Sequence, residues 1–418
     1  MEKRIFNRSL LSWCLYDWAS SPFSTIIITF VFAAYFTSSI ATSSIKGTEL
    51  WGDASSFAAL IIAILSPIFG AIADNYGRRK PWLGLFVLLT AVATALLWYA
   101  LPEHQSLAWV LTWVVIGTIA FELGNVFYNA MMPGLAPERY LGRVSGWAWG
   151  TGYVGGLVCL FTVLYCFIHH GETWFGLSKA TAAQIRVSGP FVSVWLVVFA
   201  LPLFLFTKDR QATGLSLRQA THKGLRELGS SIKKILMHRE VFKFLIARMI
   251  YIDGLNTLFA FGGIYAAGTF HMSMSEILAF GIAMNITAGI GAFTLAWVDD
   301  WIGSKRTILI AIIGLCSFGV STVLAPTKMG FWVFALPLGL FVGPVQAASR
   351  TMLARLAPRE LITEAFGLYA LSGKATAFVG PWLLGYVTYL FNSQRAGMST
   401  VLVFMLVGGI ILLFVRED

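Results

Sequence analysis

The chain has 418 residues, of which 57% are hydrophobic and only 12% are charged. Soluble domains carry about 25% charged residues, so this composition excludes an ordinary water-soluble enzyme and predicts a protein that crosses a membrane many times. A net charge of +10 indicates nucleic-acid binding in some soluble proteins, but in a membrane protein it follows from basic cytoplasmic loops. We therefore expect no nucleic-acid partner.

Twelve apolar segments approach or exceed the length of about 20 residues that a helix needs to cross a bilayer. Six precede the polar stretch 207–242 and six follow it, so we predict an all-α membrane protein with one six-helix bundle in residues 1–206 and another in residues 243–418. In chain order, the predicted spans are 10–38, 53–73, 82–101, 107–132, 144–168, 190–206, 243–269, 276–298, 307–325, 330–350, 365–391 and 397–415.

The charges between these spans predict the orientation of the chain. If both termini lie in the cytoplasm, most of the 30 Lys and Arg residues fall in cytoplasmic loops, whereas the outer loops carry no net charge. An excess of basic residues in the inner loops is the usual pattern of membrane proteins. The sequence therefore predicts an integral membrane protein with both termini in the cytoplasm.

The stretch 207–242 is predicted to be a cytoplasmic linker that contains an amphipathic helix. Its apolar residues recur at helical spacing, opposite its Lys and Arg residues. Such a helix is typical of a segment that lies on an anionic membrane surface. A solvated linker is the alternative interpretation. The apolar positions are Leu225, Leu228, Ile232, Ile235 and Leu236.

Two motifs occur once in each half of the chain. The sequence Asp-Asn-Tyr-Gly-Arg-Arg-Lys at 74–80 is matched by Asp-Trp-Ile-Gly-Ser-Lys-Arg at 300–306, and Leu-Ala-Pro-Glu-Arg at 135–139 is matched by Leu-Ala-Pro-Arg-Glu at 356–360. The spacing between copies is nearly the same for both motifs, which indicates a duplicated bundle. Membrane proteins with parallel repeats of this size are mostly transporters.

The first of these motifs resembles the loop between the second and third helices of the major facilitator superfamily of secondary transporters. The resemblance covers the whole chain and implies twelve helices in two pseudo-symmetric bundles. It also implies that Asp74 pairs with the start of the eleventh helix near Glu364, and Asp300 with the start of the fifth near Arg143, so that the cytoplasmic side is latched. A carboxylate is favoured at the positive end of a helix.

The residues assigned to this cytoplasmic gating motif include the two aspartates, the glycines and the basic residues of both copies. A basic loop that only enforces topology is the alternative, but it leaves the Asp and Gly residues unexplained. The assigned residues are Gly70, Asp74, Gly77, Arg78, Arg79, Lys80, Asp300, Gly303, Lys305 and Arg306.

A narrower resemblance lies in three segments, at 13–23 (Trp-Cys-Leu-Tyr-Asp-Trp-Ala-Ser-Ser-Pro-Phe), 247–256 (Ala-Arg-Met-Ile-Tyr-Ile-Asp-Gly-Leu-Asn) and 366–374 (Phe-Gly-Leu-Tyr-Ala-Leu-Ser-Gly-Lys). These look like signature segments of the vacuole-effluxer branch, whose autophagy-related yeast member is associated with amino-acid efflux. The small outer loops resemble those of a bacterial member, which implies a location in a bacterial inner membrane.

Several ionisable and amide side chains fall inside the predicted spans. A charge at the bilayer centre costs about 2.5–3.5 kcal/mol, so we expect these residues to face a cavity or a partner. Asp17 in the first helix and Asp253 in the seventh begin similar sequences, and the superfamily fold places these helices across a central cavity. The residues predicted to bind substrate or couple protons are Asp17, Glu122, Asn125, Arg248, Asp253, Asn256, Gln346 and Lys374.

We hypothesise that Lys374 neutralises Asp17 or Asp253 in the resting state, and that a proton or a substrate carboxylate breaks this pair. Arg350 lies close to the inner end of its span. Because long basic side chains extend along apolar surface to reach water, we expect its guanidinium to lie in solvent, with substrate binding as the alternative.

The favoured function is a secondary active transporter, acting as a monomer, in which two bundles rock around a site at the membrane midplane. Acids and bases in one cavity suit a small polar or zwitterionic solute such as an amino acid, and proton-coupled import is our first hypothesis. An exporter of amphiphilic compounds and a transporter-derived receptor are the alternatives. No metal or cofactor is expected, and an enzyme is disfavoured because no metal-ligand spacing or nucleophile motif occurs.

Overall fold

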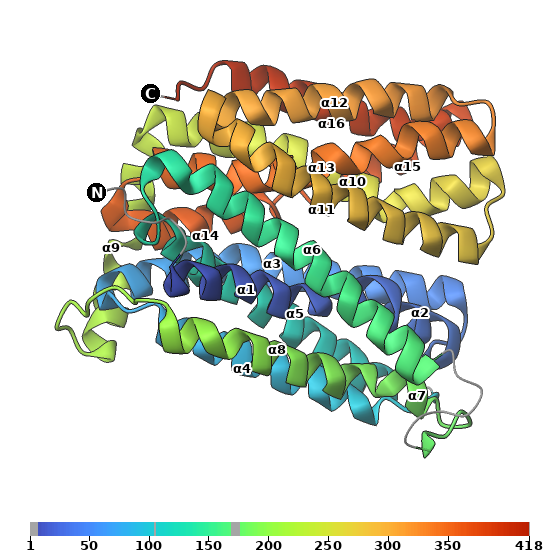
Figure 1. Ribbon diagram of the computed structural model, residues 1–418, viewed down its shortest axis with the longest axis horizontal. Coiled ribbons are helices and arrows are strands. Elements are labelled where there is room, and N and C mark those ends of the chain that lie inside the picture. Colours follow the sequence, from blue (N-terminus) through green and yellow to red (C-terminus); the bar gives the residue numbers. More distant parts are fainter. Residues whose placement is uncertain (1–6, 104–105, 169–175, 418) are drawn as a thin grey trace. The chain divides into compact units, whose positions relative to one another are not determined.

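The computed structural model describes residues 7–103, 106–168 and 176–417, and within these ranges the chain is helical, with no β-strand (Figure 1). Eleven of the described helices are long and apolar enough to cross a membrane, and a shorter apolar helix, Val379–Phe391, accompanies them. The all-α membrane fold predicted from the sequence is confirmed.

The first half of the chain runs from α1 to α8, with short connections between most of the helices. The first crossing segment contains α1 and α2, and the others each contain one long helix. The bounds are α1 (Arg8–Pro22), α2 (Phe32–Tyr35), α3 (Ser44–Tyr76), α4 (Lys80–Leu96), α5 (Leu107–Met131), α6 (Leu141–Val163), α7 (Ala183–Arg186) and α8 (Ser188–Phe206).

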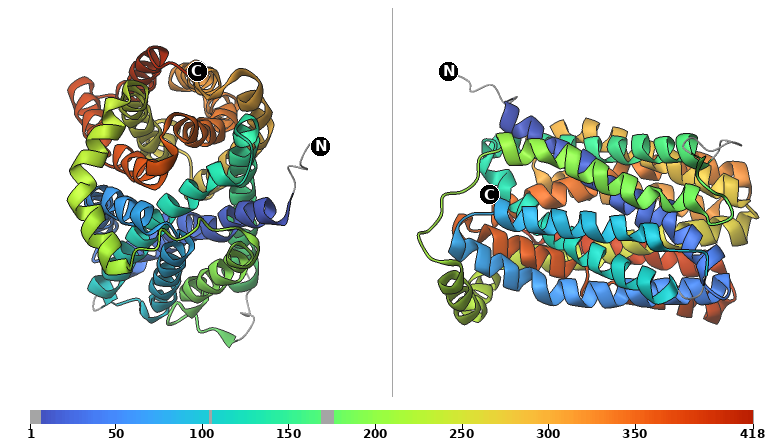
Figure 2. Two further views of the ribbon diagram at one scale, coloured as in Figure 1. Left: turned by 90° about the vertical axis from the view of Figure 1, so that its left-hand side faces the viewer. Right: turned by 90° about the horizontal axis from the view of Figure 1, so that it is seen from below.

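The second half follows a helical linker. The linker contains α9, which Figure 2 shows lengthwise in the view where α10, α12 and α16 are seen end on. The bounds are α9 (Leu217–Met237), α10 (Arg239–Phe270), α11 (Met274–Ile302), α12 (Ser304–Leu324), α13 (Lys328–Leu356), α14 (Ile362–Ser372), α15 (Val379–Phe391) and α16 (Gln394–Leu413).

The first crossing segment changes its winding at a proline. α1 ends at Pro22 and continues directly into a π-helical segment, Phe23–Phe30. Proline lacks an N–H group and its ring clashes with the carbonyl four residues earlier, so the chain beyond it winds more widely. The wide turn persists to the end of the segment, where the Val31 N–H donates to the Ile26 carbonyl at 3.0 Å. Despite this change, Arg8–Ile40 remains one continuous helical segment that is long and apolar enough to cross the membrane once.

Large apolar side chains cover the outer faces of the membrane helices. On α8, a row of aliphatic residues lies on one exposed side. Such a patch would cause association of a soluble protein, but in a bilayer it contacts lipid tails, which are equally apolar. The exposed residues of α8 are Val194, Val197, Val198, Leu201 and Leu205.

Glycine allows close contact between helices where lipid provides no hydrophobic driving force. A Cβ atom on Gly146 of α6 would lie only 2.4 Å from the Ala296 Cβ of α11, and one on Gly291 of α11 would lie 2.0 Å from the Leu340 carbonyl oxygen of α13. Both distances are far below van der Waals contact. These two positions therefore exclude any larger residue unless the helices separate.

The chain divides into two compact units. Unit 1 consists of Met1–Ile62, Arg79–Tyr128 and Thr151–Arg210, and unit 2 consists of Ala63–Arg78, Asn129–Gly150 and Gln211–Asp418. Unit 2 therefore combines the helices of the second half with the end of α3 and the start of α6. The division into bundles at residues 206 and 243 stays a prediction.

The eleventh predicted span is interrupted in the structure. The sequence predicts one helix over 365–391, but α14 ends at Ser372 and α15 begins at Val379, with turns between them. Gly373 favours this end of α14 because glycine is a poor helix former. The interruption places two helix ends, with their partial charges, inside the predicted span.

Candidate functional site

Both copies of the duplicated loop turn on a glycine with a positive φ angle. Gly77 has φ +91° and Gly303 has φ +90°, a region that residues with a Cβ rarely adopt. A Cβ on Gly77 would also lie 2.4 Å from the Gln211 carbonyl oxygen. The glycine of the motif is therefore required by backbone geometry in each half.

Asp74, just before the first of these turns, caps the start of α14. Its carboxylate accepts a hydrogen bond from the Thr363 hydroxyl at 2.6 Å and from the Glu364 N–H at 2.9 Å. The residue at the N-cap of α14, Leu361, makes no side-chain cap, so the aspartate from α3 supplies one. Gly70 permits this contact, because a Cβ there would lie 2.8 Å from the Glu364 Cα.

Asp300, at the end of α11, caps the start of α6 in the same manner. It accepts from the N–H groups of Gly142 at 2.9 Å and Arg143 at 3.3 Å. Its second oxygen lies 2.9 Å from Nε of Arg143, and its side chain is only 2% exposed. Each copy of the motif thus places a carboxylate on the positive end of a helix.

A second pair of carboxylates caps the helices that follow the two loops. Asp209 accepts from the N–H groups of Arg79 at 3.0 Å and Lys80 at 3.2 Å, at the start of α4. Glu417 accepts from the N–H groups of Ser304 at 2.7 Å and Lys305 at 2.6 Å, at the start of α12.

Each of these two carboxylates lies shortly after the last long helix of its half, α8 or α16. The N-cap residues of α4 and α12 are Arg79 and Gly303, which make no side-chain cap. Neither Asp209 nor Glu417 belongs to a motif predicted from the sequence. Both acids lie three or four residues after the last long helix of their half, α8 or α16, and this shared position in the two repeats could have identified them from the sequence.

The lysines of the two motifs make equivalent contacts at the C-terminal ends of α8 and α16. Lys80 Nζ donates to the Phe204 carbonyl at 2.9 Å, and Lys305 Nζ donates to the Leu413 carbonyl at 2.7 Å. Cations are favoured at helix C-termini. Arg78 and Arg306 are exposed, whereas Arg79 is buried.

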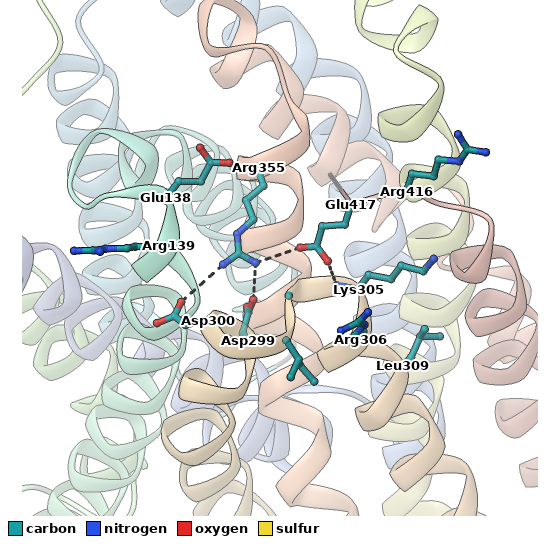
Figure 3. Close-up of a pocket in the computed structure, with 12 residues that line it drawn as sticks. Glu138, Arg139, Asp299, Asp300, Lys305, Arg306, Leu309, Arg355, Arg416 and Glu417 are labelled. Carbon is teal, nitrogen blue, oxygen red and sulfur yellow. Dashed lines mark hydrogen bonds and ion pairs between the residues drawn. The ribbon is translucent and has the colours of Figure 1, made fainter.

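Arg355 joins the acidic residues around the second loop. Its Nη1 lies 2.8 Å from Asp299 and 3.2 Å from Glu417, and its Nη2 lies 3.8 Å from Asp300. Figure 3 shows this guanidinium between the three carboxylates, in a cavity of about 800 Å³. Arg355 and Asp299 are not among the residues predicted from the sequence, because neither matches a position of the motif.

Arg350 does not reach water as expected. It is only 3% exposed, and its guanidinium donates to the Ser145 hydroxyl at 2.9 Å, the Ser145 carbonyl at 2.7 Å and the Asn129 side chain at 3.2 Å. The expectation was wrong because the start of α6 offers oxygen acceptors closer than solvent. Arg350 therefore holds α13 against α6.

The buried polar cluster of unit 2 lies where α14 ends and α15 begins. Arg248 of α10 donates to the Tyr369 carbonyl and the Ser372 hydroxyl, both at 2.7 Å. Its guanidinium carbon lies 3.3 Å from the centre of the Tyr369 ring. A cation here is stabilised by the C-terminal end of α14 and by the aromatic face.

Asp253 faces the other side of the break. Its Oδ2 accepts from the Gly380 N–H at 3.2 Å in the first turn of α15, and the residue is 2% exposed. A Cβ on Gly380 would lie 2.1 Å from the Thr257 hydroxyl, so only glycine permits this approach. The two buried charged residues of α10, Arg248 and Asp253, therefore match the opposite dipole ends of α14 and α15.

Two polar atoms of this cluster have no hydrogen-bond partner among the described residues, namely Oδ1 of Asp253 and Nε of Arg248. Lys374 lies half-buried within the break itself. Gln346 is half-buried on α13, and Asn256 is exposed on α10. Unit 2 thus brings Arg248, Asp253 and the break together, whereas Asn256 points away from the buried core.

The other predicted site residues lie in unit 1. Asp17 is on α1, and Glu122 and Asn125 are on α5; all three are half-buried. α1 and α5 are neighbours, because the rings of Trp13 and Tyr128 stack with centroids 4.4 Å apart. The structure therefore places the predicted acids of unit 1 on adjacent helices.

Comparisons with known proteins agree with this architecture. The family model described as "Vacuole effluxer Atg22 like" matches residues 138–418, and the model of the Major Facilitator Superfamily matches residues 2–160. The MFS-type transporter YxiO of Bacillus subtilis is 27% identical over 425 residues, covering 100% of this chain and 97% of YxiO. Autophagy-related protein 22 of Saccharomyces cerevisiae is 22% identical over 406 residues, covering 81% and 74%.

Solved structures show the same fold. FucP, an MFS transporter in the outward conformation, matches with a TM-score of 0.75 at 16% identity, over 98% of this chain and 99% of FucP. The proton:xylose symporter XylE matches with a TM-score of 0.73 at 15% identity, over 98% and 96%. At these identities the likeness shows the fold alone. The relatives are transporters rather than enzymes, and this integral membrane protein belongs to the vacuole effluxer Atg22-like family of the Major Facilitator Superfamily.

Proposed function

We propose that this transporter imports a small polar or zwitterionic solute, such as an amino acid, together with protons and by alternating access. It acts as a monomer in a bacterial inner membrane, with both termini in the cytoplasm. The single observation that carries the proposal is the pair of buried, oppositely charged residues Arg248 and Asp253 at the break between α14 and α15.

Each residue of this pair has one polar atom that could still form a hydrogen bond with a solute, which supports binding of a zwitterion. Buried polar atoms normally have partners, yet Oδ1 of Asp253 and Nε of Arg248 have none among the described residues. A solute carboxylate suits the guanidinium, and a solute ammonium suits the Asp253 carboxylate. A neutral or purely apolar solute would leave both charges unpaired, which is unfavourable in a buried site.

The same carboxylate is our candidate for carrying the coupled proton. A buried acid that alternates between an ammonium partner and a proton stays neutralised in both states, which avoids an isolated charge within the membrane. Lys374, within the break, and Asp17, Glu122 and Asn125 in unit 1 remain predicted members of the substrate and proton pathway. The exchange of partners between Lys374 and an aspartate also remains a hypothesis.

We assign the Asp74 and Asp300 caps to the latch that holds the cytoplasmic side closed. Both carboxylates join helix ends from different halves of the chain through buried hydrogen bonds. The basic residues beside them support a cytoplasmic location, since inner loops are enriched in Lys and Arg. An opening of this side would have to break both caps.

The test begins with a thermal-shift screen of purified protein against amino acids, organic acids and peptides, because a ligand of the folded state raises its stability. Uptake of the best ligand is then measured in proteoliposomes with and without an inward proton gradient. We expect Asp253→Asn to abolish gradient-driven accumulation while counterflow exchange persists, and Arg248→Lys to weaken binding at least tenfold. Asp53→Asn and Arg8→Lys, at exposed positions, are the matched controls.

Full proton-driven accumulation by the Asp253→Asn variant would refute the coupling role. Tighter binding of amphiphilic cations than of zwitterions would favour an exporter of amphiphilic compounds. Comparing uptake into right-side-out and inverted membrane vesicles decides the direction of transport independently of both variants.

A further inference from the structure

α9 combines a face that packs on other helices of unit 2 with a basic face that is exposed. Four residues at helical spacing form its buried stripe: Ala220, Gly224, Ser231 and Ile235. The helix is well formed from its start, where Ser216 and Gln219 make a capping box. It is thus a capped helix with one buried stripe.

The buried stripe of α9 touches the Asp74 cap from outside. A Cβ on Gly224 would lie 3.0 Å from the Ile72 Cα, so α9 lies directly against the last turns of α3. The buried Ser231 lies close enough to Glu364 to influence its carboxyl, and the Glu364 N–H donates to Asp74. The linker also holds the end of α3, because the Thr213 hydroxyl donates to the Asn75 carbonyl at 2.6 Å.

The opposite side of α9 is strongly basic and also carries apolar side chains. Leu225 and Met237 are at least half exposed there, and one acid, Glu227, lies among five exposed bases. Exposed aliphatic residues next to Lys and Arg match a surface of acyl chains and negative headgroups. The exposed bases are Arg218, Lys223, Arg226, Lys233 and Lys234.

We propose that this face of α9 docks on anionic phospholipid headgroups, and that docking clamps the Asp74 cap shut. Lipid that binds the basic face holds Gly224 against α3 and Ser231 against Glu364, so it stabilises the capped arrangement. Because such coupling is reciprocal, opening of the cap must weaken the hold of α9 on lipid. The transporter would then open more readily in membranes that are poor in anionic lipid.

The amide of Glu364 reports on this coupling directly, because it is the donor to Asp74. Hydrogen exchange of peptides covering α9 and residues 362–366 is measured in vesicles of phosphatidylcholine alone and in 7:3 phosphatidylcholine to phosphatidylglycerol. Each basic residue near an anionic surface contributes about a fivefold factor in binding. We therefore expect phosphatidylglycerol to slow exchange roughly tenfold or more at both segments, since several bases act together.

The triple variant Arg226→Gln, Lys233→Gln and Lys234→Gln should lose the lipid effect at both segments. Its matched control neutralises three exposed bases outside α9, with Arg8→Gln, Lys208→Gln and Arg359→Gln, and should keep the effect. Soluble glycerol phosphate added to phosphatidylcholine vesicles should not reproduce it. An equal effect of the soluble anion would overturn the assignment to a lipid surface.

Gly224→Val separates docking from clamping. The added side chain pushes α9 away from Ile72 while its bases stay intact, so phosphatidylglycerol should still protect α9 but no longer protect Glu364. If the Glu364 amide keeps its lipid-dependent protection in this variant, the clamp is wrong. Equal exchange rates in both vesicle types for the unaltered protein would overturn the whole proposal. Should the triple variant lose α9 even in phosphatidylcholine, single glutamine variants replace it, and each should show a partial loss.

Discussion

The carboxylate of Asp74 accepts a hydrogen bond from the backbone N–H of Glu364, which lies 290 positions further along the chain, at 2.9 Å. This contact gives α14 the cap that its own N-cap residue, Leu361, does not provide. The stability of a helix start in the second half therefore depends on a residue from the first half. Separation of α3 from α14 would leave the first N–H groups of α14 without this acceptor.

Asp74→Asn should weaken this cap. The amide keeps one acceptor oxygen but loses the charge that interacts with the helix end, a contribution of about 0.3–1 kcal/mol at exposed sites and up to about 2 kcal/mol when partly buried. Because Asp74 is 8% exposed, we expect a value near the upper limit. Hydrogen exchange of the Glu364 amide should therefore become about thirtyfold faster. Asp53→Asn is the control, and equal acceleration in both variants would contradict a local effect.

Glu364 should make the same region sensitive to pH. Burial, together with the neighbouring charge of Asp74, raises the pKa of its carboxyl from 4.5 to about 8. The folded state thus keeps a proton that the unfolded state releases above pH 4.5. Stability from this group is fully present below pH 4.5 and falls as pH rises to about 8, the sign required when the folded state binds more protons.

Replacing Glu364 by Gln should remove this dependence, because the amide stays neutral at every pH. Thermal unfolding between pH 5 and pH 8 should show a smaller decrease for Glu364→Gln than for the unaltered protein. Glu360→Gln changes an exposed carboxyl and serves as the control. Parallel pH profiles for Glu364→Gln and the unaltered protein would show that the carboxyl does not control this range.

Gly146→Leu should separate α6 from α11. A Cβ at this position would already lie 2.4 Å from Ala296 and 2.5 Å from the Ala292 carbonyl oxygen, so a leucine cannot fit without a shift of the backbone. Overpacking of this kind costs about 1–3 kcal/mol. We expect faster exchange of the Gly142 and Arg143 amides, which donate to Asp300. Gly134→Leu, where a Cβ meets nothing within 4 Å, should leave them unchanged.

The sequence predicted the membrane helices well because apolar length is a strong signal. The sequence also predicted that Asp74, Asp300 and the glycines that follow them belong to one repeated motif. Both copies have Asp and Gly at the same internal spacing. The break after Ser372 was not predicted because Gly and Pro are common inside transmembrane helices, so Gly373, Gly380 and Pro381 do not by themselves distinguish a helix end from a continuous helix. Arg350 was misjudged for a related reason: its position along the helix does not reveal the acceptors that α6 provides.

Asp209 and Glu417 could not be found by motif, because each is an isolated acid in a loop. Their role depends on which helix start lies nearby, and that is decided by tertiary packing. The pairing of Arg248 with the end of α14 was equally hidden, since it depends on the break. Sequence therefore identified the charged residues of the candidate site but not the helix ends that stabilise them.

The caps made by Asp209 and Glu417 provide a test of the duplicated design. Glu417→Gln should weaken the first turn of α12 by about 1–2 kcal/mol, because it removes two charge-assisted hydrogen bonds and leaves Arg355 with one fewer anion. Asp209→Asn removes the equivalent cap of α4, where the charge of Lys80 interacts with Asp209, and its loss should be nearer about 0.5–1 kcal/mol, the usual cost of losing a helix cap.

Both effects are measured as local hydrogen exchange, at Ser304 and Lys305 for Glu417→Gln and at Arg79 and Lys80 for Asp209→Asn. Glu138→Gln, an exposed acid in the cavity of Figure 3, is the control for a general change in charge. Each variant should affect only its own helix start, because the two caps lie in different units. If Asp209→Asn destabilised α4 more than Glu417→Gln destabilised α12, Arg355 would have no part in the second cap, and the difference between the two halves would need another cause.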